Sequence, residues 1–189
     1  MANSNNSVIT GKFRGALGKE LVFREWEGKT VVAKAPKRRQ GDSTPAQEVI
    51  QDNFTLASLY GKAVLKGQDQ GIKEAYTAAL RPRQNLYSRA MEDFLSPPVV
   101  KIIDTDNYTG IAGSRIQIRA VDDFRVTGLQ VEIYSANGTL LEKGNAVQST
   151  NGLDWTYTAT QANNPLTGSK IKATATDVPG NKGALEVTL

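Results

Sequence analysis

The chain has 189 residues with no cysteine and no histidine, and its 23 basic and 19 acidic side chains give a formal net charge of +4. An apolar fraction of 39% and a charged fraction of 22% are typical of a globular protein rather than a disordered one. The missing cysteines exclude disulfides, thiolate metal sites and cysteine nucleophiles, and the missing histidines remove the commonest general base and transition-metal ligand.

Two short runs rich in β-branched and aromatic residues predict a hairpin near the start of the chain. The runs cover residues 21–26 and 30–34, and Glu27-Gly28-Lys29 between them supplies a turn in which the glycine takes a positive φ. Upstream, Val8-Ile9-Thr10 and Phe13 predict a further short strand among several glycines.

Three helices are predicted after the hairpin. Thr44-Pro45-Ala46-Gln47 is a start signal, with threonine as the N-cap and proline at the first helical position, and apolar residues recur at helical spacing to about Lys66. Further apolar stripes predict a second helix that ends before Pro82 and a third over residues 86–95. We therefore expect residues 1–97 to form an α+β domain, made of a β-hairpin plus about three helices.

From residue 98 onward the apolar period changes from the helical one to two. Ser96-Pro97-Pro98 stops the third helix, so we expect a domain boundary there, between residues 1–97 and 98–189. Short runs bounded by turn signals predict that the second domain is an all-β sandwich. The runs cover residues 99–103, 115–121, 129–134, 139–142, 154–160, 170–176 and 184–189.

Charge changes at the same point in the chain. Residues 1–97 carry 15 basic and 10 acidic side chains, whereas residues 98–189 carry 8 and 9. The imbalance is sharpest in residues 1–40, with 9 basic and 3 acidic side chains. The net charge therefore belongs to the first half of the chain, which is the half that we expect to make intermolecular contacts.

Residues 98–189 resemble a bacterial immunoglobulin-like domain of the kind found along surface and virion proteins. The resemblance is carried by Ala120-Val121-Asp122-Asp123, by Trp155-Thr156-Tyr157 and by residues 173–181, which have the pattern A-x-A-x-D-x-x-G-N. It implies a module that binds, spaces or decorates rather than catalyses. The first half is similar to small uncharacterised proteins of Bacteroidota, through Gly15 to Gly18, Trp26 to Val32 and Pro36-Lys37. That likeness implies no activity.

No arrangement of residues in the sequence predicts catalysis. Glu25 and Glu27 lie on one face of a hairpin edge, where solvated carboxylates are ordinary. Gly11, Gly15 and Gly18 do not have the spacing of a phosphate-binding loop. We therefore expect no enzymatic activity, no catalytic residue and no cofactor, with calcium as the one alternative.

The calcium alternative rests on aspartates at the expected strand ends. Asp104, Asp106, Asp122 and Asp123 are oxygen ligands of the kind that hard cations prefer. Aspartates also populate such loops because their side chains bond their own backbone in turns. The sequence leaves both interpretations open.

Nucleic-acid binding, or contact with an acidic partner, is a second alternative. The basic residues that would provide it are Lys34, Lys37, Arg38, Arg39, Arg81 and Arg83, with Phe23 and Trp26 available for stacking. Runs of this kind are more often solvated faces.

A structural role accounts for more of these features together, because exposed strand edges recruit strands from other chains. We predict a non-enzymatic bacterial subunit that self-assembles through its N-terminal domain, as a homo-oligomer and with other assembly proteins as further partners, into a filament, tube or virion-type lattice. The expected interface residues are Val8, Ile9, Phe13, Phe23, Trp26 and Val31. For Trp26, packing in a core is the alternative.

Two further expectations complete this interpretation. The polar start of the chain and the absence of any run of roughly 20 apolar residues predict no signal peptide and no membrane span. Synthesis is then cytoplasmic, which leaves a later place in a released particle or filament open. The remaining alternative is a monomeric adhesion or recognition module that binds through loops near Asn107, Asn137 and Asn163.

Overall fold

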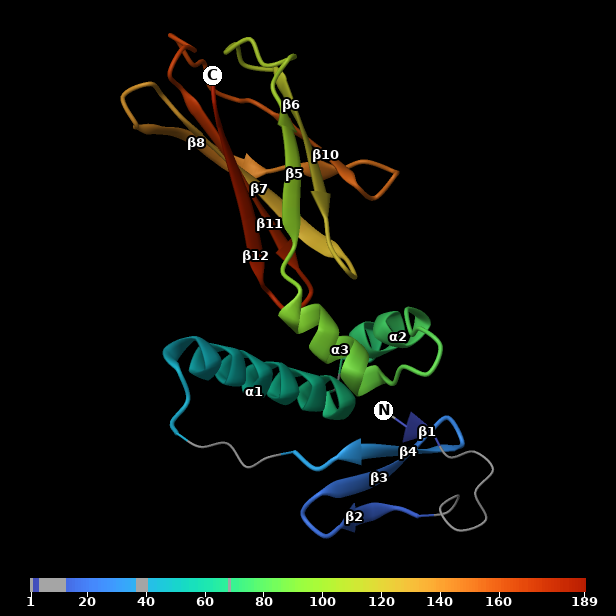
Figure 1. The fold of residues 1–189 in the computed structure, drawn as a ribbon. Helices are drawn as coiled ribbons and strands as arrows, with labels where there is room; N and C mark the ends of the chain where they lie inside the picture. Colours follow the sequence, from blue (N-terminus) through green and yellow to red (C-terminus); the bar gives the residue numbers. More distant parts are fainter. Residues whose placement is uncertain (1, 4–12, 37–40, 68) are drawn as a thin grey trace. The chain divides into compact units, whose positions relative to one another are not determined.

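The computed structural model describes residues 2–3, 13–36, 41–67 and 69–189. These residues fall into two compact units, Met1–Thr44 and Pro45–Leu189. In the part of the chain that is described, the strands form three antiparallel four-stranded sheets, one in the first unit and two in the second, which also holds the helices (Figure 1). The chain is therefore a mixed α+β protein, as the sequence predicts.

The first unit is a single sheet with the strand order β1-β4-β3-β2 (Figure 1). Its strands are β1 (Ala2–Asn3), β2 (Gly15–Leu17), β3 (Leu21–Trp26) and β4 (Lys29–Lys34). The predicted hairpin is confirmed as β3 and β4, but its turn is one residue shorter than expected. Trp26 pairs with Lys29, and Glu27 and Gly28 both have positive φ, which is the geometry of a tight two-residue turn.

The three predicted helices are confirmed as α1 (Pro45–Lys66), α2 (Gln70–Ala78) and α3 (Leu86–Leu95). The Asp69 carboxylate accepts the backbone N–H of Ile72 at the start of α2, and Asn85 forms a capping box with Ser88 at the start of α3. Gly61 lets α1 approach α3, because a Cβ at this position would lie 2.9 Å from the Tyr87 ring. None of the described helices combines the length and apolar character required to cross a membrane.

The rest of the second unit consists of two sheets with the strand orders β5-β6-β10-β9 and β12-β11-β7-β8 (Figure 1). All seven predicted runs form strands, and the sequence did not predict the two-residue strand β9. The strands are β5 (Val99–Asp104), β6 (Arg115–Val121), β7 (Val126–Tyr134), β8 (Leu140–Asn145), β9 (Val147–Gln148), β10 (Asp154–Thr158), β11 (Lys170–Asp177) and β12 (Lys182–Thr188).

One hydrophobic core lies between these two sheets. Alternate residues of β6, including Ile116 and Ile118, are buried from one side, and Val131, Ile133 and Ile171 are buried from the other. This alternation is the pattern of strands that turn one face to a core and the other to water. The two sheets therefore pack as a β-sandwich, which we call the sandwich below.

The expected domain boundary at residues 97 and 98 falls inside the second compact unit. Pro98 is fully buried, and β12 passes so close to it that a Cβ at Gly183 would lie 1.7 Å from the Pro98 carbonyl oxygen. Pro98 is therefore packed rather than part of an exposed linker, and the helices belong to the same compact unit as the sandwich.

We predict that Gly183→Ala destabilises the protein by roughly 2 to 3 kcal/mol, because the backbone at Pro98 must move to admit the methyl group. Gly128→Ala is the matched control, since Gly128 also lies in a strand but has open space at its Cβ position. Chemical unfolding of both variants checks the expectation, and equal losses of stability would contradict it.

Candidate assembly surface

The register of the first sheet decides which side chains share a face. Residues directly opposite each other in an antiparallel pair point to the same side of the sheet. Phe23 lies opposite Gly15 and Val32, and Leu21 lies opposite Leu17, so their side chains form one apolar face. The Phe13 ring joins this face by edge-to-face contact with Phe23, at a centroid distance of 5.7 Å.

The opposite face of the same sheet is also largely apolar. Val22 pairs with Ala16 and Ala33. Trp26 pairs with Lys29, and Val31 points to the same side because it is two residues from Lys29 in β4. Trp26 is 70% exposed, among the most exposed of the large apolar side chains in the described residues. The sheet therefore presents apolar side chains in both directions.

The first unit has no hydrophobic core of its own among the residues that the structure describes. Its single buried residue there is Thr30, whereas Phe13, Leu17, Leu21 and Trp26 are all exposed. Sheets in stable domains cover at least one face with a second layer. The described residues of the unit supply no second layer over this sheet, so both of its apolar faces are open to further contacts.

The edges of this sheet are also incompletely paired among the described residues. β2 pairs with β3 only at residues 21–23, and β1 pairs with β4 only at Val31 and Val32. Residues 24–26 of β3 therefore have a described ladder partner on one side, in β4. Unpaired backbone groups of this kind are the groups that an added strand binds.

The predicted interface residues fall on both faces of this sheet rather than on one. Phe13 and Phe23 lie on one face, and Trp26 and Val31 on the other. Val8 and Ile9 lie outside the described residues. The core alternative for Trp26 does not hold within this unit, because its side chain is mostly exposed.

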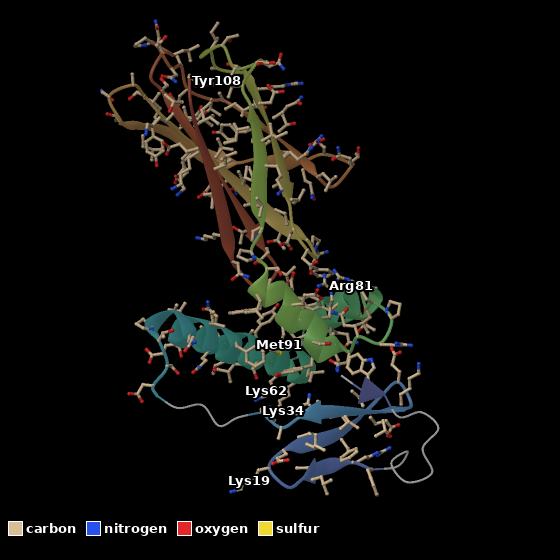
Figure 2. All side chains as sticks on the ribbon, in the orientation of Figure 1. Lys19, Lys34, Lys62, Arg81, Met91 and Tyr108 are labelled. Carbon is tan, nitrogen blue, oxygen red and sulfur yellow. The ribbon has the colours of Figure 1, made fainter. Side chains whose placement is uncertain are left out.

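The predicted basic residues are divided between the two units of the chain and its undescribed residues. Arg81 is bound in two ion pairs, to Glu92 at 2.8 Å and to Asp123 at 2.9 Å (Figure 2). Lys34 ends β4 in the first unit, whereas Arg81 and Arg83 lie in the second. Lys37, Arg38 and Arg39 lie outside the described residues.

The predicted calcium ligands do not form one site. β5 and β6 are antiparallel, with Asp104 opposite Gln117 and Val99 opposite Val121, so Asp104 and Asp122 lie at opposite ends of the strand pair. The carboxylates also have local partners. Asp104 accepts the N–H of Asp106, and Asp122 accepts those of Phe124 and Arg125. In the described ranges, no three acidic side chains come together as a group that could hold a metal ion.

An ion pair that the sequence did not reveal, between a buried arginine and a partly exposed aspartate, joins the helices to the sandwich. Arg89 of α3 is 2% exposed, and its guanidinium donates to the Asp123 carboxylate at 2.5 Å and to the Asp123 carbonyl at 3.0 Å. It also lies over the Phe124 ring, which stacks on Tyr76. Although burial opposes it, these hydrogen bonds from Arg89, together with those from Arg81, hold the pKa of Asp123 below its ordinary value.

A buried carboxylate lies beside this ion pair. Asp93 accepts the hydroxyl of Tyr76 at 2.5 Å through one oxygen, while its other oxygen is buried without a hydrogen-bond partner. Burial raises its pKa from the ordinary 3.8 to about 6, and the negative charges of Asp122 and Asp177 add to the effect. The Tyr76 hydrogen bond and the positive charge of Arg89 act in the opposite direction but do not prevail.

Asp177 and Asn181 complete the contact between helices and sandwich. The Asp177 carboxylate accepts the backbone N–H groups of Gly180 and Asn181, and so closes the turn between β11 and β12. The Asn181 side chain then donates to the Phe94 carbonyl at the end of α3, at 3.0 Å. The A-x-A-x-D-x-x-G-N run noted in the sequence therefore closes a turn and binds the helical segment.

No family model matches the sequence, and no match was found among curated proteins. Among solved structures, the chain is similar to CopC from Methylosinus trichosporium OB3b, with 15% identity and a TM-score of 0.34 over 47% of this chain and 89% of that one. It is also similar to an engineered protein (26% identity, TM-score 0.31, 48% of this chain) and to a tetra-tandem repeat in the extending region of a large adhesion protein (16%, 0.32, 49%). The match spans only 18% and 22% of those last two chains.

The raised pKa of Asp93 predicts a pH dependence of stability. The folded chain holds this proton up to about pH 6, while the unfolded chain releases it near 3.8, so stability should fall as pH rises between these values. Asp93→Asn removes the titration. The free energy of unfolding of the wild type relative to this variant should therefore drop by up to about 3 kcal/mol between pH 4 and pH 7. Urea unfolding at several pH values tests this, and parallel curves would contradict it.

Proposed function

We propose that the protein is a non-enzymatic structural subunit that self-assembles through its N-terminal sheet and displays the sandwich. The observation that carries the proposal is the sheet of the first unit, with apolar side chains on both faces and no buried hydrophobic residue among those described. Such a sheet gains stability only when another surface covers it. A filament, tube or virion-type lattice of copies provides that cover.

The free energies of apolar burial and of association are similar in size, so we expect self-association to depend on concentration. Covering the exposed parts of Phe13, Leu17, Leu21 and Trp26 contributes roughly 1 to 2 kcal/mol for each side chain, and two copies contribute together. Association costs roughly 4 to 15 kcal/mol in lost freedom. The apolar gain is thus comparable to the cost, and backbone hydrogen bonds at the incompletely paired edges add to it.

The strand order supports the proposal that the displayed domain is immunoglobulin-like. In such domains a sheet with strands A-B-E-D packs on a sheet that contains C, F and G. With β5, β6, β7, β11 and β12 taken as A, B, C, F and G, the orders β5-β6-β10-β9 and β12-β11-β7-β8 follow this arrangement. A domain of this type suits display, because its loops gather at the two ends of the sandwich.

We predict that Trp26→Ser weakens self-association by roughly ten-fold or more, because it removes a large apolar group from the surface to be covered. Val147→Ser is the matched control, since Val147 is 72% exposed but lies on the sandwich. Light scattering over a wide concentration range gives the mass of each variant, with circular dichroism to check folding. A monomeric wild type at every concentration, or equal behaviour of the two variants, would contradict the proposal.

A further inference from the structure

Helix α1 exposes more apolar surface than the rest of its compact unit covers. Its buried residues are Ala57, Gly61 and Val64, which face α3, and its first three turns contain none. Figure 1 shows these first turns extending beyond α3. Large apolar side chains between 43% and 67% exposed remain along the helix, at Val49, Ile50, Phe54, Leu56, Leu59 and Leu65.

Some of these residues form a stripe that is distinct from the packed side of the helix. Val49, Leu56, Leu59 and Ala63 follow the spacing of seven, three and four residues that places side chains in one row along a helix. At 100° per residue this row lies roughly 60° to 160° around the helix from Ala57 and Val64. α1 therefore has one face for its own unit and a second apolar row, which we call the outer stripe.

Four charges lie in or beside the outer stripe. At roughly 100° per residue Asp52 falls between Leu59 and Ala63, and the other three charges fall to one side of the stripe. Glu48 and Asp52 lie in the first half of α1, and Lys62 and Lys66 lie in the second half. None of the four has an ion-pair partner among the described residues. Within the helix Glu48 repels Asp52 and Lys62 repels Lys66, because each of these pairs joins like charges four residues apart. The helix dipole explains Glu48 and Lys66 at the ends of α1, but its effect fades before Asp52 and Lys62.

We propose that the outer stripe of α1 pairs in antiparallel orientation with the outer stripe of a second copy of this chain. Glu48 and Lys66 are equally distant from Ala57 along the helix, and so are Asp52 and Lys62. The twofold axis lies on the side of the outer stripe, level with Ala57 along the helix. Glu48 of one copy then meets Lys66 of the other, and Asp52 meets Lys62. Leu56 and Leu59 then pack against their counterparts at the axis.

The symmetry of this arrangement brings the correct flanks together. A twofold axis perpendicular to the plane of two antiparallel helices maps the front of the pair onto the front and the back onto the back. The charged side of one copy therefore lies beside the charged side of the other. A parallel pair would instead place Glu48 beside Glu48 and Lys62 beside Lys62, which is repulsive. This surface is separate from the N-terminal sheet, and the proposal goes beyond assembly through that sheet without depending on it.

The absence of cysteine from the chain allows a direct test of the register. In the full-length double variant Glu48→Cys with Lys66→Cys, the two new thiols point in the same direction from the helix, because they are five full turns apart, so each can meet its partner on the second copy. Mild oxidation should then produce a covalent dimer. Within one helix the two positions are about 27 Å apart and cannot form a disulfide. The single variants are the matched controls, because across the axis each thiol lies about 27 Å from its own counterpart. We expect roughly ten-fold more covalent dimer from the double variant than from either single variant.

Dimers of the Glu48→Cys single variant in equal yield would overturn the antiparallel arrangement. No dimer from the double variant would overturn the pairing itself, and would mean that a different partner covers the outer stripe.

Charge reversal provides a second test that does not involve cysteine. Lys62→Glu with Lys66→Glu should weaken self-association by roughly ten-fold, because all four contacts across the axis become repulsive. Adding Glu48→Lys and Asp52→Lys restores opposite charges and should restore the wild-type dissociation constant. A quadruple variant that folds normally and fails to recover would overturn the proposal. Because Trp26→Ser leaves α1 unchanged, a cross-linked dimer in that background separates this inference from the proposed role of the sheet.

Discussion

Arg89 is removed from water in the interior of the second unit, and its charge is compensated there by Asp123 and Glu92. The attachment of the helices to the sandwich depends on this charge being paired. Arg89 attaches α3 to the loop between β6 and β7, while Asn181 attaches the end of the same helix to the loop between β11 and β12. Removing the Asp123 carboxylate from the folded unit would leave Arg89 buried without this partner, which is more costly than losing a surface contact.

The described part of the first unit depends on local strand preferences rather than on a buried, paired charge or a core. Its hairpin is specified locally, by a two-residue turn and by β-forming residues on either side, yet the described residues enclose no core. Local preference forms the strands, but the described residues of the unit supply little burial. One chain thus combines a unit stabilised internally, by an ion pair and a dense sandwich core, with a sheet whose burial, in our proposal, comes from association.

The elements of this fold were predictable because their signals are local. The period of the apolar residues identified the hairpin, the three helices and all the longer sandwich strands, whereas β9, with two residues, is too short to show a period. The faces of the first sheet were not predictable, because an expected three-residue turn in place of Glu27-Gly28 changes the register. The ion pair was also beyond prediction, since Arg89 and Asp123 are 34 residues apart and either could have been solvated.

The sign pattern along α1 has a consequence for which molecules can recognise one another. A helix that is acidic in its first half and basic in its second is complementary to itself when inverted. A chain with all four signs reversed would also be complementary to itself, yet in the antiparallel arrangement each would repel the other. Two such populations held to that arrangement would therefore sort into separate pairs, and four side chains in one helix would be enough to encode the identity of a subunit.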